Sequence, residues 1–440
     1  MFKTIFKYLI SFIILVTVTY QLHDTITELK LIPKGIVKLI FPEKKSEPII
    51  KNKDINNQVE IINANSYELI VKKVDYFSGY NKDDDGTINS QHKSAALYAL
   101  KKNNTTQLEL YTRDGFLITK EGVVDFDLPK TYDSHNSQGG IRGIFYLNNQ
   151  RYAYMATLKI GCQTMSIINL DENIEIFQTD CLPDYEGVHY DGIGGASIHN
   201  AGNILLSIGA PTNNSEAIRN LAQNDKSFYG KIISINKKSI KNFLEKKEKV
   251  EIKIFTKGHR NPQGLARLKN KFFSAEHGPK GGDEVNILEE GKNFGWPISS
   301  YGVHYSSRLN HAKTNNLMEQ LEKGAPLHKS HKKFNFTEPL KYYAPKSIGI
   351  SEIIKIPKSY GKQFKNDFFV TAMGNVIEEG DQTIHHISLD NENQKIISED
   401  KIILRERIRD IIYNKKINAF LMILETGPSI GVLKFNNAKE

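Results

Sequence analysis

The stretch from Lys257 to Pro297 brings together residue types that can do chemistry. It opens with Gly258-His259-Arg260-Asn261-Pro262-Gln263-Gly264, in which a guanidinium of fixed charge and two amides lie between glycines. The proline prevents a helix from continuing through this motif. We therefore predict a turn that presents the donors of Arg260, Asn261 and Gln263 and does not fill a core.

A second loop in the same stretch has the composition of an oxygen-ligand metal site. It reads Glu276-His277-Gly278-Pro279-Lys280-Gly281-Gly282-Asp283-Glu284 and is rich in glycine, backbone carbonyls and carboxylates. Hard oxygen ligands on a flexible loop suit Ca²⁺. The stretch closes with Asn293-Phe294-Gly295-Trp296-Pro297, which contains the only tryptophan of the chain.

The order GHRNPQG, EHGP, DE and NFGWP resembles that in the soluble pyrroloquinoline quinone (PQQ)-dependent glucose and aldose sugar dehydrogenases. Four motifs in a fixed order are far more specific than one short motif. The resemblance implies an all-β, six-bladed β-propeller with PQQ over its mouth. It also implies a Ca²⁺ ion that bridges PQQ to backbone carbonyls, and oxidation of an aldose or related alcohol. Propeller turns without a ligand are the alternative, because fold does not imply function.

The resemblance assigns cofactor contacts to two parts of the chain. Arg260 and Asn261 match the cofactor-contacting pair, with Gln263 beside them, and Arg260 also belongs to the implied catalytic centre. Arg407-Ile408-Arg409-Asp410 resembles the arginine pair that binds the PQQ carboxylates. On a strand, the spacing of Arg407 and Arg409 would place both guanidinium groups on one face. Two solvent-facing charges on an edge strand are the alternative.

The resemblance also assigns metal ligands. Gly278 and Pro279 match the two carbonyl donors to the cofactor Ca²⁺. Asp283 and Glu284 match carboxylates of a neighbouring structural Ca²⁺ site. PQQ and Ca²⁺ are therefore the expected cofactors.

The segment that should hold the catalytic base departs from the family pattern. The family's catalytic histidine opens a segment of the form HxGGR, and the best match here is Asp191-Gly192-Ile193-Gly194-Gly195-Ala196. Gly192 stands at the histidine position, and Asp191 beside it is the nearest group that could take a proton. An exposed aspartate is a weak base unless its surroundings raise its pKa. His189 and His199 are nearby but out of register.

Two further positions depart from the pattern. The strand that ends in Ala-Leu-Lys in the family, with the lysine reaching the cofactor, ends here in Ala372-Met373-Gly374. After Tyr342-Tyr343 comes Ala344, so Tyr343 is the nearest ring that could cover a quinone. The departures leave two main hypotheses: a PQQ-dependent dehydrogenase with Asp191 as base, or a non-catalytic propeller that binds a carbohydrate or a protein. Ca²⁺-assisted ester hydrolysis is a third.

The rest of the chain fits one closed β-architecture. From about Leu69 to the C-terminus, short apolar runs alternate with Gly, Asn and Asp turns, as in a propeller. The net charge of +9 arises from 59 basic and 50 acidic residues, and the lysines are scattered. This pattern indicates a solvated basic surface and argues against nucleic-acid binding.

The N-terminus has the layout of an export signal. Residues 1–21 contain two lysines followed by an apolar run without a small-residue cleavage site, which favours an uncleaved anchor over a cleaved signal peptide. A buried core helix is the alternative. We expect a linker over residues 22–65, the propeller over 66–440, and a periplasmic location with an inner-membrane tether. A homodimer is a further option.

The chain contains two cysteines, Cys162 and Cys181. They flank two apolar runs around an Asp-Glu-Asn turn, so they could face each other across a hairpin. In an exported chain this arrangement permits a disulfide, and two buried thiols are the alternative.

Overall fold

The computed structural model describes residues 58–64, 67–74, 95–102, 105–112, 115–119, 122–126, 128, 140–159, 162–183, 194–211, 220–279, 281–302, 331–374, 380–424 and 429–435. The chain divides into two units, Met1–Pro48 and Ile49–Glu440, and every described residue belongs to the second. The predicted anchor over residues 1–21 therefore lies outside the described residues. Among those residues, no helix has the length and hydrophobicity needed to span a bilayer.

The described strands pair into six antiparallel sheets. The first contains β3 (Ala95–Lys102), β4 (Thr105–Thr112), β5 (Phe116–Thr119) and β6 (Gly122–Asp125). The second contains β7 (Gly140–Leu147), β8 (Gln150–Lys159), β9 (Cys162–Asn169), β10 (Ile174–Gln178) and the short β11 (Leu182–Pro183). The third contains β12 (Gly194–His199), β13 (Asn203–Ile208), β14 (Lys231–Asn236) and β15 (Ile252–Lys257).

The fourth sheet contains β16 (Pro262–Leu268), β17 (Lys271–Glu276), β18 (Asp283–Leu288) and β19 (Lys341–Tyr343). The fifth contains β20 (Ile350–Lys355), β21 (Asp367–Ala372), β22 (Thr383–Leu389) and β23 (Ile396–Ile403). The sixth joins β1 (Gln58–Ala64) and β2 (Tyr67–Val74) to β26 (Ser429–Phe435), β25 (Ala419–Leu424) and β24 (Ile408–Asn414). The described helical segments are η2 (Asn220–Ala222), α5 (Lys237–Lys246) and η3 (Lys332–Phe334).

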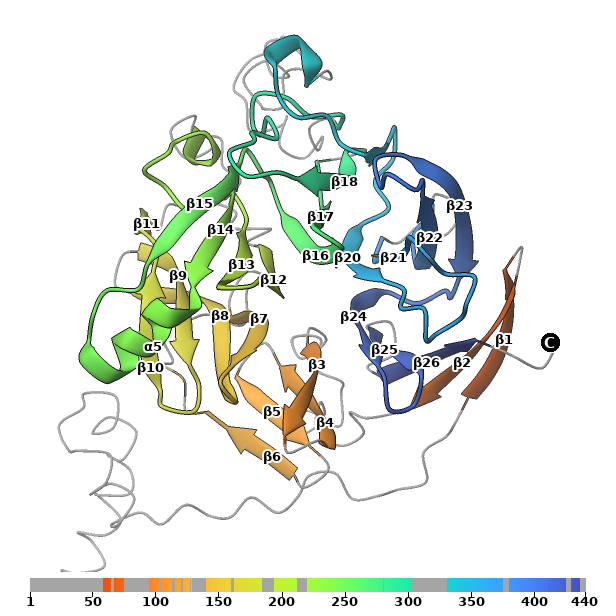
Figure 1. Cartoon of the computed structure of the whole chain (residues 1–440), viewed down its shortest axis with the longest axis horizontal. Helices are drawn as coiled ribbons and strands as arrows, with labels where there is room; N and C mark the ends of the chain where they lie inside the picture. The colour runs from red at the N-terminus through yellow and green to blue at the C-terminus, as the bar shows by residue number, and fades with distance from the viewer. Residues whose placement is uncertain are drawn as a thin grey trace, which may run out of the picture. The chain divides into compact units, whose positions relative to one another are not determined.

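The sheets form a closed ring within the second unit (Figure 1). One edge strand of each sheet contacts an edge strand of the next, in the order β3, β7, β12, β16, β20 and β24, and β24 contacts β3. Pairing of β2 with β26 joins the two ends of the described chain in one sheet. The prediction of an all-β propeller is confirmed. The expected linker boundary was too late, because β1 begins at Gln58.

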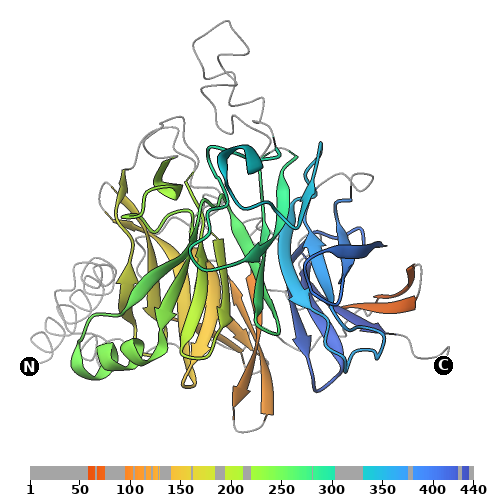
Figure 2. The same cartoon turned by 45° about the horizontal axis from the view of Figure 1, so that its top comes forward.

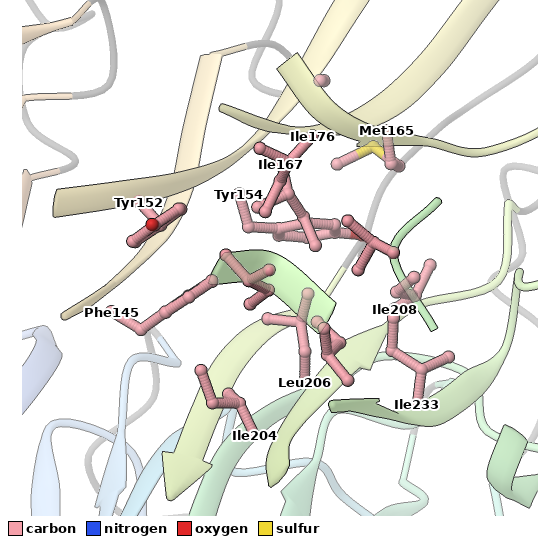
Figure 3. Packing of buried hydrophobic residues seen from close by; sticks show 14 of the residues in the cluster. Phe145, Tyr152, Tyr154, Met165, Ile167, Ile176, Ile204, Leu206, Ile208 and Ile233 are labelled. Carbon is pink, nitrogen blue, oxygen red and sulfur yellow. The ribbon is translucent and has the colours of Figure 1, made fainter. Parts of the chain in front are cut away.

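Apolar side chains fill the space between neighbouring sheets. In the largest cluster, Tyr154 and Ile167 of the second sheet face Leu206 and Ile208 of the third, and all four are fully buried (Figure 3). Similar clusters lie between the first and second, third and fourth, fourth and fifth, and fifth and sixth sheets. Since most strands have neighbours on both faces, their sequences read as apolar runs.

Local sequence sets the turns and the helix. Asn148 and Asn149 both have positive φ, at 52° and 64°, between paired β7 and β8. A two-residue hairpin requires this conformation, and asparagine tolerates it. The helix α5 begins after Asn236, whose side chain accepts a hydrogen bond from the Ser239 backbone N–H at 2.9 Å. Figure 2 shows this helix beyond the lower ends of β14 and β15.

The two cysteines lie in the second sheet and the segment that follows it. Cys181 precedes β11, and β11 pairs with the start of β9, where Cys162 stands. Cys181 is disulfide-bonded, and Cys162 is the only other cysteine in the chain. The disulfide alternative is therefore confirmed over the buried thiols.

Candidate active site

The predicted site residues that the structure describes gather at one end of the ring. The N–H of Gly194, where β12 begins, donates to the Asn261 side-chain oxygen at 3.2 Å, just before β16. The N–H of Ile350, where β20 begins, donates to the Asp283 carboxylate at 3.0 Å. Arg407 directly precedes β24. We call this end, where these edge strands begin, the ring mouth.

Arg260 is held in place from several sides. Its backbone N–H donates to the Glu276 carboxylate, and its Nη1 donates to the His277 carbonyl at 2.9 Å. Its guanidinium lies 5.6 Å from the centre of the Trp296 ring, and only 4% of the residue is exposed. A cation held in this way is already ordered, so it loses little further conformational freedom when it binds an acidic ligand. The guanidinium is therefore preorganised at the mouth.

Buried polar groups support this turn from below. The ring nitrogens of His259 contact the Glu276 carboxylate and the Thr256 hydroxyl, each at 2.8 Å, and the ring stacks on Phe294 at 4.6 Å. Glu276 therefore links the His259 ring to the backbone of Arg260. This support was missed in the sequence, although His259 and Glu276 stand in the quoted motifs. The pattern carried no signal that they meet across the turn.

The other predicted donors of the turn lie beside Arg260. The Asn261 carbonyl accepts a hydrogen bond from the His277 N–H at 2.9 Å, and the residue is buried. Gln263 is half-buried on β16. The amide side chain of Asn261 thus joins β12 to β16, in addition to any contact with a cofactor.

The predicted carbonyl ligands lie on a tightly packed loop after β17. The N–H of Gly278 donates to Asp283 at 3.0 Å, and a Cβ at Gly278 would overlap the Gly282 carbonyl. The Pro279 carbonyl accepts a hydrogen bond from the Ser347 hydroxyl at 3.0 Å. A carbonyl oxygen has two lone pairs, so the Pro279 carbonyl can still contact a cation. The Pro279 carbonyl therefore fits its expected role.

Asp283 has a structural role in addition to the one expected. Its carboxylate accepts hydrogen bonds from the backbone N–H groups of Gly278, Ile348 and Ile350, each at 3.0 Å, and it is fully buried. Nδ1 of His277 is 3.1 Å away. Burial opposes ionisation, but His277 and the backbone donors together hold the pKa of Asp283 below its usual value. Asp283 therefore ties loops together, and its predicted role as a metal ligand beside Glu284 stays a prediction.

Glu284 lies opposite Glu276 in the antiparallel pair of β17 and β18. Burial and the charge of Glu276 raise the pKa of Glu284 well above its usual value. Its carboxylate is 3.6 Å from His331 Nε2 and accepts a weak hydrogen bond from Asn286 at 3.4 Å. In the described part of the chain, the Asn286 Oδ1 and Ser274 Oγ atoms are buried without hydrogen-bond partners.

This donor set fits Ca²⁺, because carboxylate, amide and hydroxyl oxygens are its preferred ligands and a cation would relieve the repulsion between the two carboxylates. No cluster of three or more His, Cys, Asp or Glu side chains suited to a metal occurs among the described residues. A calcium ion beside Glu284 would therefore also need neutral oxygen ligands.

The opposite side of the mouth is built around Gly374. Arg407 donates a hydrogen bond to the carbonyl of Met373, the residue directly after β21. A Cβ at Gly374 would overlap the carboxyl group of Asp381, which is only 3% exposed. The carboxyl group of Asp381, two residues before β22, thus occupies the space beside the position at which the family has its lysine. No local pattern in the sequence signals this contact, because Asp381 stands seven positions after Gly374.

We expected the guanidinium groups of Arg407 and Arg409 to lie on one face of a strand, but the structure gives no regular strand over these residues. Arg407 precedes β24, and the register with β25 shifts between Ile408 and Asp410, which makes Arg409 the extra residue of a bulge. A bulge interrupts the two-residue alternation of a strand. The spacing of the arginines was therefore a poor guide to their orientation.

Tyr343 does not cover the mouth. It is buried, with the Lys341 ammonium 4.9 Å from its ring centre and its hydroxyl 3.4 Å from Glu399. Glu399 also contacts Lys341 at 2.6 Å and Nδ1 of His385 at 2.9 Å, and Nε2 of His385 contacts the Gly380 carbonyl at 3.0 Å. Burial opposes ionisation of Glu399, but His385 and Lys341 lower its pKa to about 2. This network holds the residue before Asp381.

The predicted base stays untested. Asp191 and His189 lie outside the described residues. His199 ends β12 and is exposed, so the whole length of that strand separates it from Gly194 at the mouth.

Comparisons with known proteins agree with this architecture. A family model described as Glucose / Sorbosone dehydrogenase matches residues 164–429. An uncharacterised protein of Synechocystis sp. is 31% identical over 218 residues, which is 47% of each chain. An aldose sugar dehydrogenase of Escherichia coli (strain K12) is 51% identical over 55 residues, 12% of this chain and 15% of that protein. The matches thus span about half or less of these relatives.

Two solved structures share the fold. A crystal structure of glucose dehydrogenase has a TM-score of 0.58 at 20% identity, covering 78% of this chain and 96% of that one. The apo-form of the soluble aldose sugar dehydrogenase from Escherichia coli has a TM-score of 0.56 at 19% identity, covering 78% and 99%. Since the family model covers more than half of the 440 residues, the chain belongs to the Glucose / Sorbosone dehydrogenase family.

Proposed function

We propose that this protein is a PQQ- and Ca²⁺-dependent dehydrogenase that oxidises an aldose sugar or a related alcohol. We also propose that the six sheets are the six blades of that family's propeller. The observation that carries the functional proposal is the preorganised Arg260–Asn261 turn next to the Gly278–Pro279 carbonyls, in a chain of this family. Bound PQQ would accept the hydride of the substrate.

The residues at the mouth would bind and orient. Arg260 is a nearly buried guanidinium, and charge-assisted hydrogen bonds to a carboxylate are strongest where water is excluded. Arg407 would contribute a second cation from the opposite side. The carbonyls of Gly278 and Pro279 would hold the calcium that neutralises negative charge on the cofactor. Asp191 would take the hydroxyl proton, provided that its surroundings raise its pKa.

A titration with PQQ tests the proposal. The full-length protein in detergent would be titrated with PQQ in Ca²⁺ and in chelator, followed by calorimetry and absorbance. We expect binding that depends on Ca²⁺ and weakens about tenfold or more in Arg260→Ala and in Arg407→Ala. Arg267→Ala is the matched control, because Arg267 is exposed on the same β16 strand that follows Arg260. Absence of binding to folded protein at saturating PQQ would contradict the proposal.

One observation favours a second function. The carboxylate of Asp381 lies beside the position at which the family has its cofactor-binding lysine, and a negative group there opposes a cofactor with three acidic groups. The second candidate is therefore a non-catalytic propeller that binds a carbohydrate or a protein partner. This alternative would be established if the folded protein does not bind PQQ but binds an immobilised glycan in the presence of Ca²⁺.

The N-terminal export signal supports a periplasmic location with a membrane tether as part of the proposal. Fractionation of expressing cells checks it. Recovery of the full-length chain from the soluble cytoplasmic fraction would contradict it.

A further inference from the structure

Lys231, the first residue of β14, is fully buried at the mouth end of the third sheet. Its Nζ donates to the carbonyls of Leu221, Ala222 and Tyr229, each at 2.9 Å. An ammonium group has three N–H donors, so these three bonds use all of them. Neutral carbonyls therefore cage a buried cation, which costs desolvation energy and calls for an explanation.

The cage lies directly behind the turn that carries Arg260. The Ala222 carbonyl that accepts from Lys231 also accepts the Gly258 N–H at 3.1 Å. The carbonyl of Gly230, the residue before Lys231, accepts the His259 N–H at 3.1 Å. The loop from Asn220 to Gly230 thus contacts the backbone of the two residues that precede Arg260.

The same loop also holds the tryptophan beneath the guanidinium. Nε2 of Gln223 donates to the Trp296 carbonyl at 2.6 Å and to the Asn293 side chain at 3.1 Å. Nδ2 of Asn293 donates back to Gln223 at 2.7 Å. The backbone N–H of Trp296 donates to the Gly258 carbonyl at 2.9 Å, and the Trp296 ring contacts the guanidinium of Arg260. Gln223 therefore links the Lys231 cage to one contact surface of Arg260.

These segments pack closely against one another. A Cβ at Gly230 would overlap the Ala222 side chain, and a Cβ at Gly258 would overlap the Asn293 side chain. Ala222 and Trp296 pack in one buried cluster. Close-packed segments transmit a displacement because they have no void in which to absorb it. A shift of the loop would therefore move both the turn and the tryptophan.

We propose that Lys231 is a positioning residue for Arg260. Its caged ammonium fixes the loop from Asn220 to Gly230, and through Gln223 and Trp296 that loop fixes the guanidinium at the mouth. A lysine that only fills space would leave Trp296 and Arg260 unchanged when its donors are removed. The effect on PQQ rests on the proposed function, but the effect on Trp296 does not.

The single tryptophan makes the inference testable without any ligand, since intrinsic tryptophan fluorescence reports on Trp296 alone. Lys231→Met keeps most of the side-chain length and removes the three donors. Lys238→Met is the matched control, because Lys238 is exposed on α5. Emission and acrylamide quenching of the full-length protein would be measured at a temperature where circular dichroism shows each variant folded.

We expect a red-shifted emission and about twofold or stronger quenching in Lys231→Met, because Trp296 is only 5% exposed in the intact protein. The control should match the wild type. PQQ affinity, where the wild type binds PQQ, should fall about tenfold or more, as expected when a binding group is displaced by a fraction of an ångström to an ångström. A folded Lys231→Met with a lowered melting temperature but unchanged emission and PQQ affinity would overturn the proposal.

Gln223→Ala keeps the test decisive should Lys231→Met fail to fold, because it cuts the link to Trp296 without touching the cage. It should reproduce the change in Trp296 emission, and unchanged emission would overturn the proposal. In the double variant, the two changes in emission should be less than additive, since both act through one loop. Failure of the wild type to bind PQQ would refute the proposed function. The change in Trp296 emission would still test whether Lys231 positions Arg260.

Discussion

The two sides of the ring mouth are built differently. On one side, the loop after β17 is packed backbone against backbone, so that Gly278 has no room for a Cβ beside the Gly282 carbonyl. On the other side, the atoms nearest to a Cβ at Gly374 all belong to the Asp381 side chain. A backbone contact cannot be relieved by one substitution, whereas a side-chain contact can. The two sides should therefore respond differently to an added methyl group.

The largest expected effect tests the backbone-packed side. Gly278→Ala should lower the free energy of unfolding by about 3 kcal/mol, because the new methyl group must displace the Gly282 carbonyl and the Asp283 hydrogen bonds. Urea denaturation with circular dichroism measures this change. Gly202→Ala is the control, since a Cβ at Gly202 would meet no atom within 4 Å. Equal stability of the two variants would contradict the comparison.

A smaller effect is expected on the other side. Gly374→Ala should cost about 2 kcal/mol, because the carboxyl group of Asp381 must move out of its buried place. In an Asp381→Ala background the same substitution should cost much less, since the overlapping atoms are gone. A double-mutant cycle by urea denaturation isolates this coupling. Strict additivity would show that backbone, and not Asp381, limits the space at Gly374.

Strand patterns predicted the fold well, because alternation of apolar runs with Gly and Asn turns depends on local sequence. The motif around Arg260 and Gly278 also predicted residues that the structure brings together at the mouth. What the pattern could not reveal were partners distant in sequence. The contact of Glu276 with Arg260 crosses a turn, and Asp381 reaches Gly374 from just before the next strand.

Two features of the mouth were not visible in the motifs. The alternation rule does not apply at Arg409, because a bulge shifts the register there. Asp283 and Glu284 were assigned to one metal site by resemblance to the family motif, which carries no signal that Asp283 accepts hydrogen bonds from three backbone N–H groups. No role for Lys231 was predicted from the sequence. Its burial depends on a loop that folds back over it, and no local pattern in the sequence records that.

The smallest expected effect concerns pH and the Lys231 cage. Burial lowers the pKa of Lys231 to about 7, with Asp225 opposing this shift and Lys257 adding to it. In the unfolded chain the pKa of lysine is near 10.4. Between these values the unfolded chain holds more protons than the folded one, so the free energy of unfolding rises with pH. From pH 7 to pH 8 the wild type should gain about 1 kcal/mol relative to Lys231→Met.

Urea denaturation of both proteins at pH 7 and pH 8 measures this difference, and groups that titrate equally in the two proteins cancel. A parallel pH dependence would show that Lys231 gives up no proton in this range. A gain of the expected size would show that the folded protein releases the Lys231 proton near neutral pH, because keeping the buried ammonium charged has a cost in stability. Such a cost is understandable if the ammonium holds the Arg260 side of the mouth in its geometry, whereas no buried lysine has been found to support the described residues around Gly374.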